Sequence, residues 1–292
     1  MKKTPLFRGA ATALITPFAD GEIDYPAFGR MIDRQCASGI AALVVCGTTG
    51  EASALSDEEH AALTAFAKEH TAGRVPVLAG CGSPSTEHAR KLVRETCAAG
   101  ADGVLVVTPY YSKCSQEGLY RHYMTLADAS PAPLLLYEVP GRTGVRAEPE
   151  TYLRLSVHEN IAGVKDASGD VEHAADIRFL CGDALPLYAG NDGLTVPLLS
   201  LGALGVISVL SNPAPAAVCD LCRMWFSGNA AGAGELQCRL SPAIRALFSE
   251  VSPIPVKTVM AARGFCREEF RLPLCPMEPE KRTQLLGSLD SI

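Results

Sequence analysis

A lysine directly after a short apolar run is the residue best placed for covalent chemistry. Lys165 follows residues 161–164 (Ile-Ala-Gly-Val), a run typical of a buried strand. A charged ammonium group at such a strand end is unfavourable, and the neutral amine is the form that attacks a ketone to give an imine. The alternative is a solvent-facing lysine paired with Asp166. The position of Lys165 alone leaves both interpretations open.

Hydroxyl side chains follow two other apolar runs. Tyr137 ends residues 134–137 (Leu-Leu-Leu-Tyr), and a phenol at the end of a buried strand can relay protons. Thr48 and Thr49 lie in residues 47–51 (Gly-Thr-Thr-Gly-Glu). Two glycines there allow close backbone approach, and the hydroxyl and amide groups suit a carboxylate. The alternatives are a core tyrosine with a satisfied hydroxyl and an ordinary loop.

Two further segments supply candidates for binding or proton transfer. Tyr110 and Tyr111 follow residues 106–109 (Val-Val-Thr-Pro), so they are candidates for proton donors or for an interface patch. Arg142, in residues 141–144 (Gly-Arg-Thr-Gly), offers a planar guanidinium group that suits a carboxylate. A solvated loop arginine is the alternative interpretation of Arg142.

The histidines and cysteines favour neither a metal site nor a disulfide framework. The six histidines show no ligand spacing, and His60 and His88 lie in helical patterns typical of surface residues. The eleven cysteines are odd in number and scattered through apolar stretches, which favours reduced, buried thiols. Cys219 and Cys222 form a CxxC motif without a second pair, and their spacing suits one face of a core helix.

These candidates need a fold that brings the ends of separate apolar runs together. Eight runs alternate with amphipathic stretches, and their continuous apolarity is typical of strands buried on both faces of a parallel sheet. The first run leads into Thr16-Pro17-Phe18 and not into the GxGxxG turn of an open doubly wound sheet, so a closed (β/α)8 TIM barrel is favoured. Active sites of such barrels lie at the carboxyl ends of the strands. The runs are residues 11–15, 41–46, 75–79, 103–107, 134–137, 161–164, 187–189 and 206–209.

Helical patterns fill the spaces between the runs. Residues 56–59 (Ser-Asp-Glu-Glu) form a capping box that predicts the start of a helix. We expect residues 1–212 to form the barrel and residues 213–292 to form a C-terminal helical extension packed on it as part of one structural unit. The other helical stretches are residues 87–99, 116–129 and 171–180.

Composition narrows the class of protein. The chain has 292 residues, of which 48% are hydrophobic and 20% charged, as in ordinary globular proteins. A net charge of −6 argues against a nucleic-acid partner. Residues 1–5 lack the apolar run of a signal peptide, and the longest apolar segment, residues 194–210, is interrupted by proline and glycine. We therefore expect a cytoplasmic protein that does not bind membranes and acts on small molecules.

Five motifs, taken together and in their order along the chain, resemble the 4-hydroxy-tetrahydrodipicolinate synthase (dihydrodipicolinate synthase) family of the N-acetylneuraminate lyase superfamily. The resemblance extends over nearly the whole chain, from about Phe7 to the C-terminal helices. The motifs are residues 47–51, 108–111 (Thr-Pro-Tyr-Tyr), 137–144 (Tyr-Glu-Val-Pro-Gly-Arg-Thr-Gly), 163–169 (Gly-Val-Lys-Asp-Ala-Ser-Gly) and 205–209 (Gly-Val-Ile-Ser-Val).

The resemblance implies a class I, Schiff-base aldol condensation, the committed step of diaminopimelate and lysine biosynthesis. Lys165 would form an imine with pyruvate, and the derived enamine would attack L-aspartate 4-semialdehyde. Tyr137, Thr48 and Tyr111 would form a proton relay, with Tyr111 reaching into the site of a neighbouring subunit. The protonated imine nitrogen takes up the developing negative charge, so no cofactor or metal is implied.

The resemblance also implies the binding groups and the assembly. Thr49, together with the neighbouring Thr48, would hold the pyruvate carboxylate, and Arg142 would bind the carboxylate of the semialdehyde. Gly190 and Ile207 would line the site through their backbones. The expected assembly is a homotetramer built as a dimer of dimers.

The chain departs from the family pattern in two places. Glu138 stands where the family usually has Asn, and its carboxylate either pairs with Arg142 or points away. The second departure is in the site where some members bind lysine as an inhibitor, of which His60 and Tyr110 remain. Replacement of a Glu by His88 removes the counter-charge for the lysine ammonium group, so weak or absent lysine inhibition is expected. The changed positions are Ala52, Asp57, Pro84 and His88.

Two other functions stay open. N-acetylneuraminate lyase and keto-deoxy sugar acid aldolases also form a pyruvate imine on this barrel, but sialic acid lyases typically carry Ser-Thr at Thr48-Thr49 and lack the Arg142-Thr143-Gly144 segment. A non-catalytic relative that binds a keto acid would be expected to have lost some of the lysine, tyrosine and threonine residues, and all of them are present here.

Overall fold

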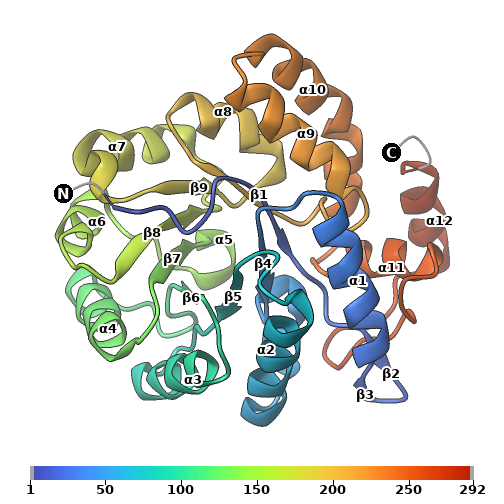
Figure 1. Cartoon of the computed structure of the whole chain (residues 1–292), viewed down its shortest axis with the longest axis horizontal. Coiled ribbons are helices and arrows are strands. Elements are labelled where there is room, and N and C mark those ends of the chain that lie inside the picture. Colours follow the sequence, from blue (N-terminus) through green and yellow to red (C-terminus); the bar gives the residue numbers. More distant parts are fainter. Residues whose placement is uncertain (1–2, 290–292) are drawn as a thin grey trace.

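The chain forms a closed barrel of eight parallel strands surrounded by helices (Figure 1). The structure is a computed structural model that describes residues 3–289. Each barrel strand pairs with the next one along the chain, and the last pairs with the first, so the predicted (β/α)8 barrel is confirmed. The strands are β1 (Gly9–Ala13), β4 (Ala42–Val45), β5 (Val77–Gly80), β6 (Gly103–Val107), β7 (Leu134–Glu138), β8 (Ile161–Asp166), β9 (Leu187–Ala189) and β10 (Gly205–Ser208).

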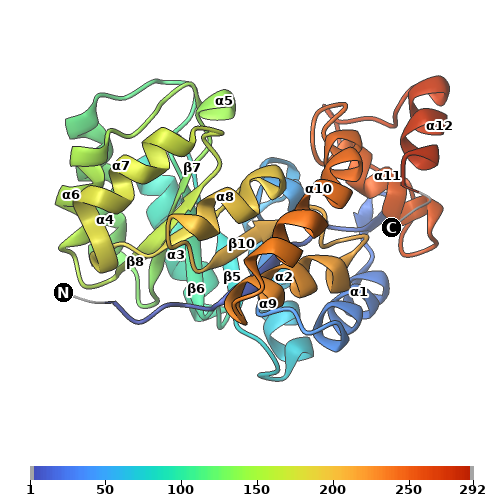
Figure 2. The same ribbon diagram turned by 90° about the horizontal axis from the view of Figure 1, so that it is seen from above.

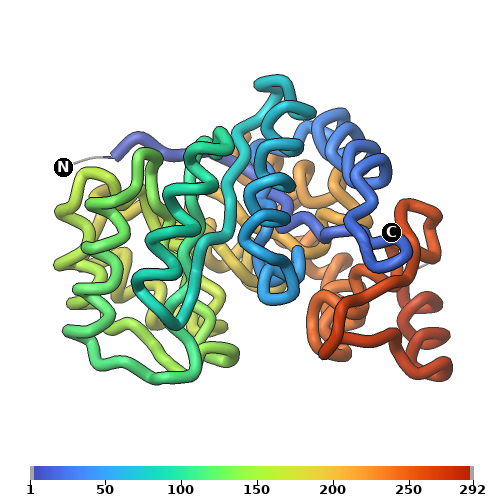
Figure 3. The backbone as a smooth tube through the Cα atoms, turned by 90° about the horizontal axis from the view of Figure 1, so that it is seen from below, coloured from blue at the N-terminus to red at the C-terminus, as the bar shows by residue number. Residues whose placement is uncertain are grey.

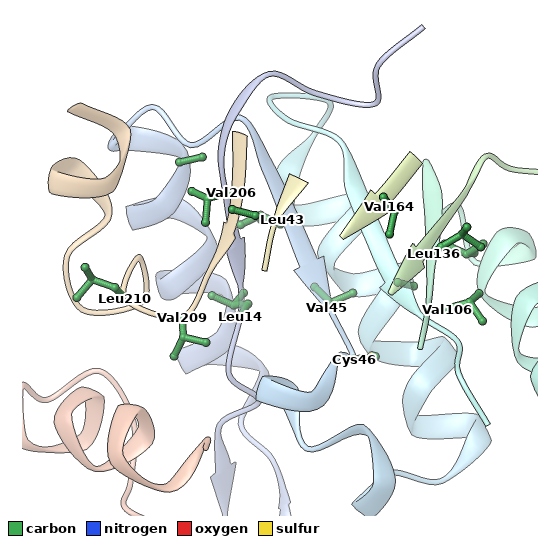
Figure 4. Close-up of a cluster of buried hydrophobic side chains, with 14 of the residues drawn as sticks. Leu14, Leu43, Val45, Cys46, Val106, Leu136, Val164, Val206, Val209 and Leu210 are labelled. Atoms are coloured by element: carbon green, nitrogen blue, oxygen red, sulfur yellow. The ribbon is translucent and has the colours of Figure 1, made fainter. Parts of the chain in front are cut away.

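The barrel strands are mostly apolar because both of their faces are buried, and most of their polar residues lie at the carboxyl ends. Along β7, Leu135 and Tyr137 belong to the cluster that fills the barrel, whereas Leu134 and Leu136 belong to the cluster between the strands and the helices. Figure 4 shows the second cluster, with Leu136 beside Val164 on the outer side of the strands. Burying each such side chain stabilises the fold by about 1.5–3 kcal/mol.

Helices follow most of the strands and cover the outside of the barrel (Figure 1). The predicted capping box starts α2: Glu59 N–H donates to Ser56 Oγ at 3.1 Å, and Ser56 N–H donates to the Glu59 side chain at 2.9 Å. The covering helices are α1 (Tyr25–Ala37), α2 (Asp57–Thr71), α3 (Thr86–Ala98), α4 (Gln116–Ala129), α6 (Pro149–Ser156), α7 (Val171–Cys181), α8 (Thr195–Ser200) and α9 (Pro215–Phe226).

Three helices after α9 form the C-terminal extension: α10 (Ala230–Leu247), α11 (Ile254–Ala262) and α12 (Pro279–Gly287). Helix α9 contacts β1 and α10 contacts α8 and α9, so the extension continues directly from the ring of helices. Figures 2 and 3 place α11 and α12 at the opposite end of the molecule from α4 and α6. The expected start of the extension at residue 213 falls before α9, which is one of the helices that cover the barrel. Residues 1–2 and 290–292 lie outside the described residues.

All eleven cysteines are free thiols. The expectation that they are buried holds for five of them, whereas four are partly buried and Cys238 and Cys275 are exposed. Cys219 and Cys222 are buried on α9, where they pack in the hydrophobic core, so their interpretation as core residues is confirmed. Within residues 3–289, no group of three or more His, Cys, Asp or Glu side chains is arranged to hold a metal ion. No helix in that part of the chain is both long and apolar enough to cross a membrane.

Candidate active site

Lys165 and Tyr137 lie side by side within the mouth of the barrel. They are paired in register on β8 and β7, and Lys165 Nζ lies 4.0 Å from the centre of the Tyr137 ring. Both side chains are buried, with exposed fractions of 6% and 8%. The Asp166 carboxylate instead accepts a hydrogen bond from Ser168 N–H at 2.7 Å and is itself buried. The alternative of a solvent-facing lysine paired with Asp166 is therefore wrong.

Gly190 leaves room for the lysine side chain. A Cβ atom at this position would lie 3.0 Å from Lys165 Cε and 2.8 Å from Ala167 Cβ, so a larger residue would displace them. Gly190 N–H donates to the Asp166 carbonyl at 2.6 Å, which fixes the end of β9 against β8. Ile207 is fully buried in the same barrel-filling cluster as Tyr137. The structure therefore places Gly190 directly against Lys165 and the side chain of Ile207 in the barrel interior.

Asp192 is a buried acid close to Lys165 that the sequence analysis missed. Its carboxylate accepts hydrogen bonds from the N–H groups of Val209 (2.9 Å) and Leu210 (3.1 Å), at the end of β10. Burial raises the pKa of Asp192, and these hydrogen bonds together with the nearby charge of Lys165 partly offset the rise. Asp192 could have been found from the sequence, because it lies shortly after the apolar run 187–189, as the other candidates lie after their runs.

The predicted carboxylate-binding segment forms a tight turn, η1 (Thr48–Gly50). Gly50 N–H donates to the Gly47 carbonyl at 3.0 Å, and Thr16 Oγ1 donates to the Gly50 carbonyl at 2.7 Å. A Cβ atom on Gly50 would lie 3.1 Å from the carbonyl oxygen of Leu14, so glycine permits this close backbone contact. Thr49 is buried, and Thr48 is half-buried beside the cavity described next.

One cavity of about 380 Å³ brings five of the predicted residues together, since it is lined by Thr48, His60, Tyr110, Tyr137 and Arg142. Its size suits a small ligand. Tyr111 lies outside this cavity, since its side chain is 91% exposed and its backbone is in the left-handed region at φ 71°. Left-handed backbone is uncommon for a residue with a bulky side chain.

Arg142 lies on the short helix α5 (Pro140–Thr143), which follows β7 (Figure 2). Its guanidinium group donates a hydrogen bond to the carbonyl of Ser252 at 2.9 Å, just before α11. A guanidinium group has five N–H donors, so this contact leaves it able to bind a carboxylate in the cavity.

Glu138 points away from Arg142, which decides between the two orientations left open by the sequence. Its carboxylate is fully buried between the barrel and the helices outside it. It accepts hydrogen bonds from Tyr152 Oη (2.7 Å) and Ala147 N–H (3.0 Å), and lies 3.0 Å from His173 Nε2. Because Tyr137 points into the barrel, its strand neighbour Glu138 must point outward. The carboxylate therefore holds α6, α7 and the segment after α5 in place.

Replacing Glu138 by Gln is expected to lower the midpoint of thermal unfolding by about 4–8 °C, because the Gln side chain cannot accept all three hydrogen bonds that the Glu138 carboxylate accepts. This shift corresponds to a loss of about 2 kcal/mol in the free energy of unfolding. Burial lowers the pKa of His173, but its hydrogen bond and charge interaction with Glu138 outweigh that effect and raise it. The ion pair between His173 and Glu138 therefore contributes fully to the free energy of unfolding below about pH 6.5. This contribution is lost as the pH rises through the raised pKa of His173.

The midpoint difference between Glu138→Gln and the unmodified protein should accordingly be larger at about pH 5.5 than at about pH 9. Differential scanning calorimetry at the two pH values measures this. Glu172→Gln makes the same chemical change at an exposed position on α7 and serves as the control. A Glu138→Gln difference that grew with pH would contradict the assigned pairing.

Four residues expected at or near an inhibitor site, His60, Tyr110, Asp57 and His88, also line the cavity. His60 is buried there, and its ring nitrogens have no hydrogen-bond partner among residues 3–289. Its burial corrects the interpretation of His60 as a surface residue, and burial also lowers its pKa. Asp57 pairs with His88 Nε2 at 2.9 Å and with Lys91 Nζ at 2.7 Å, so its carboxylate is already neutralised by the protein. His88 and Pro84 are exposed.

Comparison with known proteins gives one consistent result. The model of the dihydrodipicolinate synthetase family matches residues 6–292. The 4-hydroxy-tetrahydrodipicolinate synthase of Geobacter sulfurreducens is 46% identical over 280 residues, which are 96% of this chain and 97% of that protein. The crystal structure of dihydrodipicolinate synthase from Thermotoga maritima is 41% identical, covers 98% of both chains and has a TM-score of 0.96. A structure described as the first monomeric dihydrodipicolinate synthase variant is 41% identical, covers 97% of this chain and 96% of its own, and has a TM-score of 0.95.

Proposed function

The chain belongs to the dihydrodipicolinate synthetase family, and on that premise we propose a role for each residue of its active site. The protein is a lyase that condenses pyruvate with L-aspartate 4-semialdehyde in the biosynthesis of diaminopimelate and lysine. The observation that carries the residue assignments is the buried pair on β7 and β8, with Lys165 Nζ 4.0 Å from the Tyr137 ring. The remaining groups are assigned from their places around this pair.

Lys165 is the covalent nucleophile. Its neutral amine adds to the keto carbon of pyruvate, and loss of water gives an imine. Loss of a proton from the methyl carbon then gives an enamine, whose carbon forms the new C–C bond with the aldehyde carbon of the semialdehyde. The amino group of the semialdehyde moiety finally attacks the imine carbon and displaces the lysine, which gives 4-hydroxy-tetrahydrodipicolinate and free enzyme.

Tyr137, Thr48 and Tyr111 transfer protons in these steps. Tyr137 lies against the amine, and Thr48 lines the same cavity as Tyr137. Tyr111 acts in the site of a second copy of the chain, and its 91% exposure and left-handed backbone support this role. A positioned acid–base group typically accelerates such steps by about 10²–10⁴-fold.

The carboxylates of the two substrates bind at separate places. The turn that carries Thr48 and Thr49 binds the carboxylate of pyruvate through hydroxyl and backbone N–H groups. Arg142, which lines the cavity, binds the carboxylate of the semialdehyde. Gly190 and Ile207 line the site through their backbones, and no cofactor takes part.

The second candidate function is cleavage of sialic acid or of a keto-deoxy sugar acid through the same imine. Arg142 favours the semialdehyde, because a guanidinium group suits a carboxylate better than a polyhydroxylated sugar tail. Two parallel assays separate the functions: pyruvate plus semialdehyde, coupled to a reductase that consumes the product, and release of pyruvate from N-acetylneuraminate. Turnover in the second assay alone would overturn the assignment.

We also propose a cytoplasmic homotetramer, assembled as a dimer of dimers. Free thiols at all eleven cysteines favour a reducing compartment. The exposed Tyr111 needs a neighbouring subunit to reach a second active site. Sedimentation analysis of the purified protein, compared with a Tyr111→Ala variant, tests this assembly; a monomer with full activity would contradict it.

Lysine is expected to inhibit the protein weakly or not at all. Asp57 carries the one carboxylate among the described residues that line the cavity, and it is already paired with His88 and Lys91, so it is not free to bind the lysine ammonium group. An initial-rate inhibition curve measures the effect, with His88→Glu as the comparison that restores a counter-charge and should strengthen inhibition. Half-inhibition of the unmodified protein below about 1 mM lysine would refute the prediction.

A further inference from the structure

A buried ion pair joins the carboxylate-binding turn to the C-terminal extension. Glu51 directly follows η1, and its side chain accepts a hydrogen bond from Lys257 Nζ of α11 at 2.6 Å. The two residues are 206 positions apart in the sequence, and their side chains are 1% and 0% exposed. Neither residue lines the cavity, so the pair has no assigned role in the reaction.

The surroundings of the pair fix both partners tightly. Lys257 Nζ lies 4.1 Å from the centre of the Phe18 ring and 5.1 Å from that of Phe270, so the ammonium group is held by aromatic faces as well as by the carboxylate. The other oxygen of Glu51 accepts a long hydrogen bond from Arg271 N–H at 3.4 Å. Burial lowers the pKa of Lys257, and the charge and hydrogen bond of Glu51 oppose this effect.

The backbone of Glu51 is in the left-handed region, at φ 55° and ψ 37°. For a residue other than glycine this conformation costs about 1–2 kcal/mol, and it persists only where the surroundings enforce it. Here it reverses the chain so that Glu51 N–H donates to the Thr48 carbonyl (3.2 Å) and Ala52 N–H donates to the Gly47 carbonyl (3.2 Å). The ion pair therefore holds the residue whose backbone closes the turn.

Stability alone does not account for the pair. Replacing a buried ion pair by apolar or neutral groups of similar size is often neutral or stabilising, because the desolvation of two charges offsets their attraction. The left-handed backbone of Glu51 and the buried charge beside the Thr48–Gly50 turn instead indicate that the pair fixes the conformation of this turn.

We propose that Glu51 and Lys257 are positioning residues that hold the Thr48–Gly50 turn in its pyruvate-binding geometry. The C-terminal extension thereby takes part in substrate binding although it lies outside the barrel. This inference rests on the proposed role of Thr48 and Thr49 in binding the pyruvate carboxylate.

The test compares Glu51→Gln, Lys257→Met and the double variant. Each single variant leaves an unpaired buried charge, so its thermal midpoint should fall, whereas the double variant removes both charges and should recover most of the midpoint. The pyruvate KM should rise about tenfold in all three, since small displacements of binding groups have large kinetic effects. The semialdehyde KM should change less than twofold, because Arg142 binds elsewhere.

The control variants are Glu268→Gln and Arg282→Met, which break an ion pair inside the C-terminal extension (2.9 Å) that does not contact the turn. They should alter the midpoint without altering the pyruvate KM. A double variant of Glu51 and Lys257 that recovers both the midpoint and the pyruvate KM would overturn the proposal, as would one that fails to fold. Absence of a borohydride-trapped pyruvate adduct in the unmodified protein would instead overturn the proposed function on which the inference rests.

Discussion

Replacing Lys165 by alanine is expected to lower kcat by about 10⁴-fold or more, because no other group can form the imine. Lys165 is buried beside Tyr137, and Gly190 leaves the space that its side chain occupies. The substitution removes a long side chain without adding a charge or a larger group, so we expect the fold to be retained. Steady-state turnover in the coupled semialdehyde assay, with circular dichroism as a check of folding, measures the effect.

Lys281→Ala is the matched control for this substitution. Lys281 is exposed, pairs with Glu250 and lies on α12, far along the chain from the barrel strands. Its removal should leave kcat within about twofold, since substitutions at exposed ion pairs have small effects. Turnover of Lys165→Ala close to that of the control would contradict the covalent mechanism.

Replacing Tyr137 by phenylalanine is expected to lower kcat by about 10²–10³-fold while changing the thermal midpoint little. The substitution removes only the hydroxyl group, so the ring remains beside Lys165 Nζ and stays packed in the barrel-filling cluster. The loss should therefore appear in turnover and not in folding. Parallel measurements of kcat and of the thermal midpoint separate the two effects.

Tyr152→Phe is expected to lower stability and to leave turnover nearly unchanged, which is the opposite of the effect expected for Tyr137→Phe. Tyr152 is also a buried tyrosine, but its hydroxyl donates to Glu138 at 2.7 Å, on the outer side of the barrel. Its removal should lower the free energy of unfolding by about 1–3 kcal/mol, because a buried carboxylate loses a hydrogen bond. Turnover should stay within a few-fold. Equal losses of kcat in the two Tyr→Phe variants would refute the assignment of Tyr137 as the acid–base group.

The strands and the residues at their ends could be predicted because each strand appears in the sequence as a short continuous run of apolar residues. Every apolar run overlaps a barrel strand, since strands buried on both faces are mostly apolar. The exact ends were less certain: Lys165 lies within β8, which continues to Asp166, and not beyond the strand. The short hairpin of β2 (Phe18–Ala19) and β3 (Glu22–Ile23) was missed, because a two-residue strand has no periodic pattern.

The sequence contained more information about Glu138 and about residues 25–37 than we used. Strand alternation alone predicts that Glu138 faces outward when Tyr137 faces into the barrel. Helix α1 was not predicted, although its buried residues Phe28, Met31 and Ile32 have helical spacing. Both could have been found from periodicity, and neither required knowledge of tertiary contacts.

Other parts of the site depend on contacts that no local pattern reveals. The hydrogen bond of Arg142 to Ser252 and the ion pair of Glu51 with Lys257 join residues that are 110 and 206 positions apart. Their partners are fixed by how the C-terminal extension packs on the barrel. A single sequence contains no signal that pairs them, because many Lys and Glu residues in the chain would serve equally well.

The most direct test of the central claim is reductive trapping of the imine. The protein is incubated with pyruvate and sodium borohydride, and its intact mass and proteolytic peptides are measured by mass spectrometry. The proposed mechanism predicts one reduced pyruvate adduct per chain, located on Lys165, and no adduct on Lys165→Ala. An unmodified chain, or an adduct on a different lysine, would contradict it.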